Sequence, residues 1–298
     1  MATWKKIKLP SIQGIVPGSP AGTVGTFTLP LGYRYANLQL VYIDGGSSPN
    51  DMLAMFDDVL VYKNTKAQRT HNATELNRLN SINGSQYAYK KVNTGAAQRQ
   101  SLFVHFLEPW RKNPVDTDAS AWNVSPTDNW NNFQATIKLL DDMPSTATLI
   151  AYAWVSDLLA LPAGQTQAIK KVYRANIPAS GTSIDVTTLD DADNYQTILL
   201  KNPTTGYISQ ASLKRGGVTY IDQVMREDNI AHLASQNLNP NDSTTSGEFG
   251  YEIVLDADDP VNNALPVNAS NTLWLQLGFN TAAAGNVVGL IERVGAAD

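Results

Sequence analysis

The stretch "NTLWLQLGFNTAAAGNVVGLIERVG", residues 271–295, decides the fold class. Leu273, Leu275, Leu277 and Phe279 alternate with Thr272, Trp274, Gln276 and Gly278, so the apolar set lies on one side of an extended chain. Small residues follow, and then a second apolar run extends from Val287 to Val294. This pattern predicts a β-hairpin with one face in a core.

An earlier part of the chain repeats this pattern. In "NNFQATIKLLDDMPSTATLIAYAWV", residues 131–155, Phe133 stands where Leu273 does, a shift of 273 − 133 = 140 residues. Two short helices are expected, one with Asn72 as its N-cap and Glu75 three residues later, and one in "EDNIAHLASQ". Their apolar positions match at a shift of 154 residues (230 − 76), and the first strands, "KKIKL" and "KKVYR", match at 165 (170 − 5). The order of elements repeats while loop lengths differ, which favours a duplication.

The sequence therefore predicts an all-β protein of two tandem eight-stranded antiparallel units, each with a short helix in a connecting loop. The segment "LPAGQTQ" at 161–167 is typical of a linker, so the expected domains are 1–162 and 163–298. Short strands in this number fit a jelly roll better than an immunoglobulin-like sandwich.

Composition limits the possible functions. Hydrophobic residues make up 43% of the 298 residues, charged residues only 16%, and there is no cysteine, so disulfides and thiolate chemistry are excluded. The net charge of −5 argues against direct, specific nucleic-acid binding. We expect synthesis in the cytoplasm, because the basic start "MATWKKIKLP" is not followed by an apolar stretch.

In organisation, size and composition, from Lys5 to Val294, the chain resembles double jelly-roll major capsid proteins of icosahedral, membrane-containing tailless bacteriophages of the corticovirus and finnlakevirus types. The resemblance implies a structural protein and no enzyme. It implies homotrimers with a pseudo-hexagonal outline that pack against neighbouring trimers in an icosahedral shell. It further implies an internal viral membrane or membrane proteins as partners, a vertex (penton) protein, and a place in the virion capsid.

Enzymatic alternatives find little support. A bicupin would need clustered metal-binding histidines, but His71, His105 and His232 are far apart in sequence. His105 and Glu108, three residues apart in one strand, are expected to point to opposite faces. No G-x-S-x-G elbow and no phosphate-binding loop are present. We therefore expect no catalytic residues and no organic cofactor.

Two acidic segments are candidates for calcium. "LDADDP" carries Asp256, Asp258 and Asp259, and "LDDADN" carries Asp190, Asp191 and Asp193. Carboxylate oxygens are the ligands that calcium prefers, but neither segment has the Gly and terminal Glu of an EF-hand. The first segment is the candidate metal site, and ordinary turns are the alternative.

The connection "EPWRKNPVDTDASAWNVSPTDNW" at 108–130 contains Trp110, Trp122 and Trp130. A solvated loop should not carry three tryptophans, because each can bury up to about 200 Å². The loop either folds back on its own domain or packs against a neighbouring subunit. The low charged fraction and the resemblance to capsid proteins favour the second possibility, with the tryptophans as trimer-interface anchors. A carbohydrate-binding β-sandwich with an exposed tryptophan platform is the alternative, although the second half has no counterpart to these residues.

The N-terminal arm "ATWKKIK" places Trp4 beside Lys5, Lys6 and Lys8 in an otherwise acidic chain. Tryptophan prefers the headgroup boundary of a bilayer, and lysine is attracted to anionic lipid. These residues are the candidate membrane-facing set. An ordinary first strand with a charged edge is an equal alternative.

Overall fold

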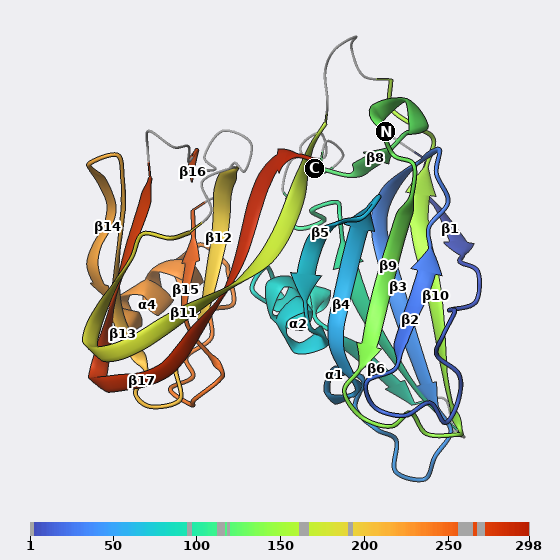
Figure 1. Ribbon diagram of the computed structural model, residues 1–298, viewed down its shortest axis with the longest axis horizontal. Helices are drawn as coiled ribbons and strands as arrows, with labels where there is room; N and C mark the ends of the chain where they lie inside the picture. The colour runs from blue at the N-terminus through green and yellow to red at the C-terminus, as the bar shows by residue number, and fades with distance from the viewer. Residues whose placement is uncertain are drawn as a thin grey trace. The chain divides into compact units, whose positions relative to one another are not determined.

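The computed structural model describes residues 3–93, 97–111, 117, 120–160, 167–189, 193–255, 265–266 and 272–297. The chain forms two compact units, one of Met1–Lys170 with Ala296–Asp298 and one of Lys171–Gly295 (Figure 1). The sequence predicts a division after residue 162. The compact units divide after Lys170, because Ile169 is buried in the core of the first unit and Ala297 packs against that core.

The first unit is a sandwich of two antiparallel sheets (Figure 1). One sheet has the order β1-β10-β3-β7-β6, with β8 also paired to β3, and the other contains β5-β4-β9-β2. Successive strands alternate between the sheets from β1 to β4 and from β8 to β10, as in a jelly roll, while β4 and β5 share one sheet and β6, β7 and β8 share the other. The strands are β1 (Lys5–Lys8), β2 (Val24–Thr28), β3 (Tyr33–Asp44), β4 (Phe56–Lys63), β5 (Lys66–His71), β6 (Lys90–Asn93), β7 (Gln98–His105), β8 (Trp122–Val124), β9 (Phe133–Leu139) and β10 (Ala147–Ser156).

The first unit also contains the short helices α1 (Met52–Met55) and α2 (Ala73–Ser81) and the 3-10 turns η1 (Ser85–Tyr87) and η2 (Pro126–Asp128); α2 contacts α1, η1, β4 and β7. The N-terminus of α2 has the expected capping box, in which Asn72 Oδ1 accepts from the Glu75 amide at 2.8 Å and Glu75 Oε2 accepts from the Asn72 amide at 2.9 Å. Leu76 and Leu79 are buried, as the helical spacing predicts.

Alternation along β9 sets the core. Phe133, Ala135, Ile137 and Leu139 are buried, while the residues between them are only partly covered. A strand with one apolar face buries that face against the opposite sheet, so the pattern read from the sequence fixes the orientation of β9.

The second unit repeats the order of the first, with two long strands, β11 and β17, among its described elements (Figure 1). β13 pairs with β14 and β17, and β12 pairs with β15, β16 and β17. Counterparts of α2 and β7 follow as α4 and β15, which confirms the predicted double jelly roll. The elements are β11 (Ala168–Val186), β12 (Asn194–Lys201), β13 (Ile208–Arg215), β14 (Val218–Met225), α4 (Arg226–Ser235), β15 (Phe249–Val254), β16 (Leu265–Pro266) and β17 (Leu273–Ala296).

Both predicted hairpins are wrong. β17 is one strand whose start pairs with β13, Leu273 opposite Arg215, and whose end pairs with β12, Val294 opposite Asn194. Its small-residue stretch lets the strand bend instead of folding back on itself, and Gly285 has φ 100° there. Likewise β9 pairs with β2 and β4, whereas β10 pairs with β1 and β3 in the other sheet. The turn between β9 and β10 therefore crosses from one sheet to the other.

Candidate functional site

The N-terminal arm is an ordered edge strand. β1 runs antiparallel to β10, with Lys6 opposite Trp154 and Lys8 opposite Tyr152. The Lys6 ammonium lies 4.3 Å from the centroid of the Tyr152 ring and 5.9 Å from that of Trp154. Lys5 and Lys8 are exposed as well, so the candidate membrane-facing lysines form a basic edge beside aromatic rings.

Trp4 precedes this strand and is partly buried. The guanidinium of Arg34 lies 5.6 Å from the centroid of its ring. A cation over a tryptophan face is stabilised by the ring quadrupole, which orders the ring at the start of β1. The structure therefore brings the four arm residues together at one edge of the first sheet.

Two of the three loop tryptophans belong to the core of the first unit. Trp122 is 0% exposed and Trp130 is 3% exposed in the single chain. The Trp122 ring centroid lies 4.5 Å from that of Phe106 and 6.0 Å from those of Trp130 and Phe133. The expected anchors against a neighbouring subunit are thus wrong for these two residues, because the loop folds back on its own domain. Their burial also removes the tryptophan platform expected of a carbohydrate-binding module.

Trp110 lies apart from that cluster and is half-buried. Its ring packs edge-on against Tyr87, 5.4 Å between centroids, and against His105, 5.8 Å away. Burial lowers the pKa of His105 to about 3, and the cations Arg69 and Lys170 add to this effect. His105 is therefore a neutral packing residue at physiological pH.

A buried carboxylate, not anticipated as a site, holds this loop in place. Glu108 Oε2 accepts from Arg111 Nε at 2.9 Å, and Glu108 Oε1 also contacts the Lys170 ammonium. All three side chains are at most about a tenth exposed. Burial opposes ionisation of Glu108, but the two cations outweigh it and hold its pKa below the usual range. The cluster ties the loop to the start of β11. The one sequence signal was a Glu that ends the apolar run "LFVHFLE".

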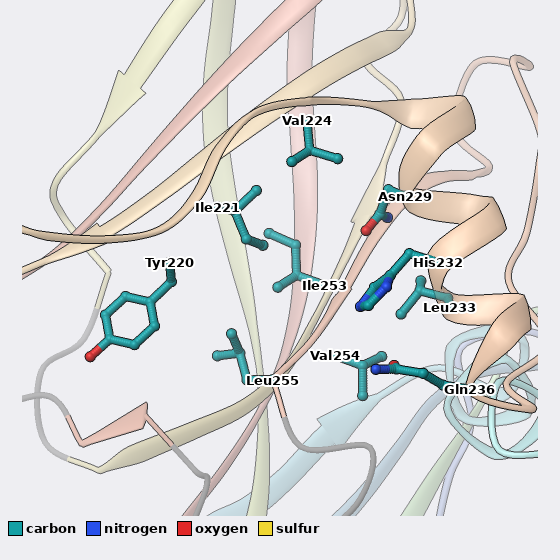
Figure 2. Close-up of a pocket in the computed structure, with 10 residues that line it drawn as sticks. All are labelled: Tyr220, Ile221, Val224, Asn229, His232, Leu233, Gln236, Ile253, Val254 and Leu255. Carbon is teal, nitrogen blue, oxygen red and sulfur yellow. The ribbon is translucent and has the colours of Figure 1, made fainter.

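The second unit contains a pocket of about 500 Å³ between α4, β14 and β15. Figure 2 shows Asn229, His232, Leu233 and Gln236 projecting from α4 toward side chains of the two strands. The strands contribute mainly apolar groups: Tyr220, Ile221, Val224, Ile253, Val254 and Leu255. The Asn229 amide is already engaged, because its Nδ2 donates to the Glu252 carbonyl at 2.7 Å. Among the described residues that line this pocket none is a carboxylate, and their chemistry suits an apolar side chain better than a metal ion.

The candidate calcium residues Asp256, Asp258 and Asp259 lie outside the described residues, as do Asp190 and Asp191. The sixth aspartate, Asp193, is buried and paired with two cations, Lys171 at 3.1 Å and Arg293 at 3.4 Å. Within the described ranges no group of three or more acidic, His or Cys side chains could hold a metal ion.

The free edges of the sheets differ in character. β6, at one end of the first sheet, has the sequence KKVN and is exposed along its whole length, with Val92 56% exposed. β14, at the end of its sheet in the second unit, exposes Val218, Tyr220 and Met225 together with Asp222. One edge is therefore basic and the other is apolar with an acidic group.

The two units also differ in net charge. The first contains 15 Lys and Arg against 13 Asp and Glu, a net of +2. The second contains 7 against 14, a net of −7, and the two together give the −5 of the whole chain. The two units therefore have net charges of opposite sign.

In the part of the chain described here, every helix is too short or too polar to cross a bilayer.

Several solved structures of virus proteins have the same fold. The major capsid protein P2 of bacteriophage PM2 superposes with a TM-score of 0.76 at 17% identity, over 99% of this chain and 98% of that one. A chain from Sulfolobus turreted icosahedral virus gives 0.65 at 15% identity, covering 98% and 91%. The Faustovirus major capsid protein gives 0.61 at 7% identity, covering 99% and 90%. At these identities the likeness establishes the double jelly-roll fold.

Family membership rests on the sequence. No curated protein matches the chain significantly. The family described as viral coat protein P2 N-terminal domain matches residues 6–156, which span β1 to β10. This match covers half of the chain and the whole first sandwich. The chain therefore belongs to the viral coat protein P2 family.

Proposed function

We propose that this coat protein is the major capsid protein of its virus and forms trimers with a pseudo-hexagonal outline that tile an icosahedral shell. The family match over residues 6–156 carries the proposal. The repeated jelly roll supports it, because three copies of a chain with two similar units present six similar units around a threefold axis. The role is structural, with self-assembly in place of catalysis.

The shell is proposed to enclose an internal membrane, with the arm of Trp4, Lys5, Lys6 and Lys8 facing the lipid. What supports this is the exposed basic edge of β1 and the partly buried tryptophan beside it. Each lysine near an anionic surface contributes on the order of 1 kcal/mol of attraction. Membrane proteins and a vertex (penton) protein are the other proposed partners. Direct nucleic-acid binding is not proposed, because the net charge is −5.

Light scattering on the purified chain tests the self-assembly. A homotrimer would have three times the monomer mass of 32.3 kDa. Electron microscopy of the same sample should show particles with a pseudo-hexagonal outline. A mass of one chain at every concentration up to about 100 µM would contradict the proposal, because a coat contact must persist at the high concentration of an assembling virion.

A further inference from the structure

We infer that β14 of one copy pairs edge to edge with β6 of a second copy, so that the acidic second unit docks on the basic first unit of its neighbour. This inference rests on the proposed self-assembly and names the surfaces that carry it. The occupant of the β14 edge is thus another copy of this chain.

β14 is an edge strand whose pairing with β13 has register shifts on either side of Leu213, and Gln223 in it has φ 49°. Within the described residues its strand partner is β13, and its other edge has none. Soluble proteins usually protect such edges with lysine, proline or a short strand. The eight residues VTYIDQVM contain neither Lys nor Pro, and Val218, Tyr220 and Met225 are 56%, 45% and 44% exposed. An apolar exposed edge of this kind is typical of a strand that binds another strand.

The pocket beside β14 also supports the addition of a strand at this edge. Tyr220, Ile221 and Val224 of β14 line it together with side chains of α4 and β15 (Figure 2). If β6 is the added strand, Val92 is the apolar side chain that it would bring next to this pocket. Its volume of about 500 Å³ leaves room for a side chain as large as valine or leucine.

Charge selects β6 as the partner. Asp222 on β14 and Asp228 at the start of α4 make this edge acidic, whereas the neighbouring Glu227 is paired with Arg226 at 3.0 Å. β6 presents Lys90, Lys91 and the exposed Val92. Lys90 donates to the Ser85 carbonyl and Lys91 to Asp51, and both lysines remain exposed. Opposite charges on adjacent strands stabilise the pair.

Like edges would repel each other. Two β14 strands would place acidic groups side by side and bring together units with a net charge of −7 each. Two β6 strands would likewise place their lysines side by side. A contact between different surfaces of identical chains is heterologous, and such contacts close into rings when the rotation permits. The β14–β6 pairing is of this kind.

A charge swap tests the pairing in the full-length chain. Asp222→Lys and Lys90→Glu should each weaken association by about tenfold or more, because like charges then meet at the edge. The double variant D222K/K90E restores opposite charges and should recover the wild-type association to within about threefold. Matched controls are Asp242→Lys and Lys66→Glu, exposed residues outside both edges, which should leave association unchanged. Association is measured as mass against concentration by light scattering.

Each outcome of the charge-swap experiment leads to one conclusion. If wild type associates and both single variants associate equally well, the edge pairing is overturned and the proposed coat function stands. If Asp222→Lys is rescued by Lys6→Glu on β1 and not by Lys90→Glu, β1 is the partner strand and the inference is wrong. If wild type never associates, self-assembly itself fails. Circular dichroism checks that each variant is folded. Val92→Asp adds a negative charge to β6 and leaves both of its lysines in place, and this second variant is also expected to weaken association.

Discussion

Replacing Trp122 by alanine should lower the stability of the first unit, and should not act directly on a contact between subunits. The side chain is fully buried, and three aromatic rings surround it with centroids 4.5 to 6.0 Å away. Truncating a buried tryptophan to alanine costs about 3–5 kcal/mol, because the transfer free energy is lost and a cavity remains. For a unit of this size, that loss lowers the melting temperature by roughly 6–20 °C.

Two further variants sharpen the test. Trp122→Phe keeps an aromatic ring and removes an indole N–H that has no acceptor in this structure, so its cost should be clearly smaller. Trp110→Ala removes a half-buried ring at the loop surface and should also cost less. Calorimetry measures each melting temperature, and light scattering measures the mass of the same samples. An unchanged melting temperature for Trp122→Ala together with loss of the trimer would refute this reasoning and restore the interface role.

Four other outcomes are expected. Glu108→Gln should destabilise the first unit by about 3–5 kcal/mol, because two buried cations lose their partner; urea unfolding measures it. The lowered pKa of Glu108 and the pKa of about 3 for His105 both make stability fall in acid, the histidine from about pH 6.5 downward and the glutamate only below about pH 4.5. His105→Phe should therefore flatten the unfolding profile between pH 6.5 and 4.5, and an unchanged slope would argue against a buried neutral histidine. Lys5→Gln with Lys6→Gln should weaken sedimentation with anionic vesicles by about tenfold or more, and neutral vesicles are the control. Millimolar calcium should raise the melting temperature if residues 256–259 bind it, and a flat response to calcium and chelator would return them to ordinary turns.

The order of the elements could be predicted because it depends on local signals. Alternation along β9 reports which side chains are buried, and the capping box at Asn72 is complete within four residues. The alternation recurs at the start of β17, and the helical spacing recurs at α4, which has Met225 as its N-cap and lacks the capping box. The order of elements therefore predicts the duplication without knowledge of any contact.

Pairing partners could not be predicted in the same way. Two alternating runs joined by a short turn fit a hairpin and also fit a crossing between two sheets, because both bury the same residues. In the structure β9 and β10 lie in different sheets, and β17 bends through its small residues with each half on a different partner. The choice depends on distant strands, which no local pattern encodes.

The residue types likewise predicted that the loop tryptophans are buried, but not which side chains bury them. Trp122 and Trp130 are buried, as their size requires, but in their own domain, because Phe106 and Phe133 already provide an aromatic surface there. The sequence does not predict the buried charge cluster of Glu108, since a carboxylate that follows a strand usually lies in solvent. Its partners Arg111 and Lys170 stand three and 62 residues away, and only the fold brings the second one near.

The divergence of the two units bears on how such a coat can assemble. Duplication alone would give two units with the same surface, and identical surfaces permit many equivalent contacts between copies. A net charge of +2 on one unit and −7 on the other removes that equivalence, because contacts between two acidic units are then unfavourable. The cores of the two units do not differ in this way, because each core is formed by the apolar faces of its strands. Selection on packing therefore keeps the two folds alike, while the charge difference favours contacts of one unit with the other. If so, raising the salt concentration should weaken specificity between unlike edges before it lowers the stability of either fold.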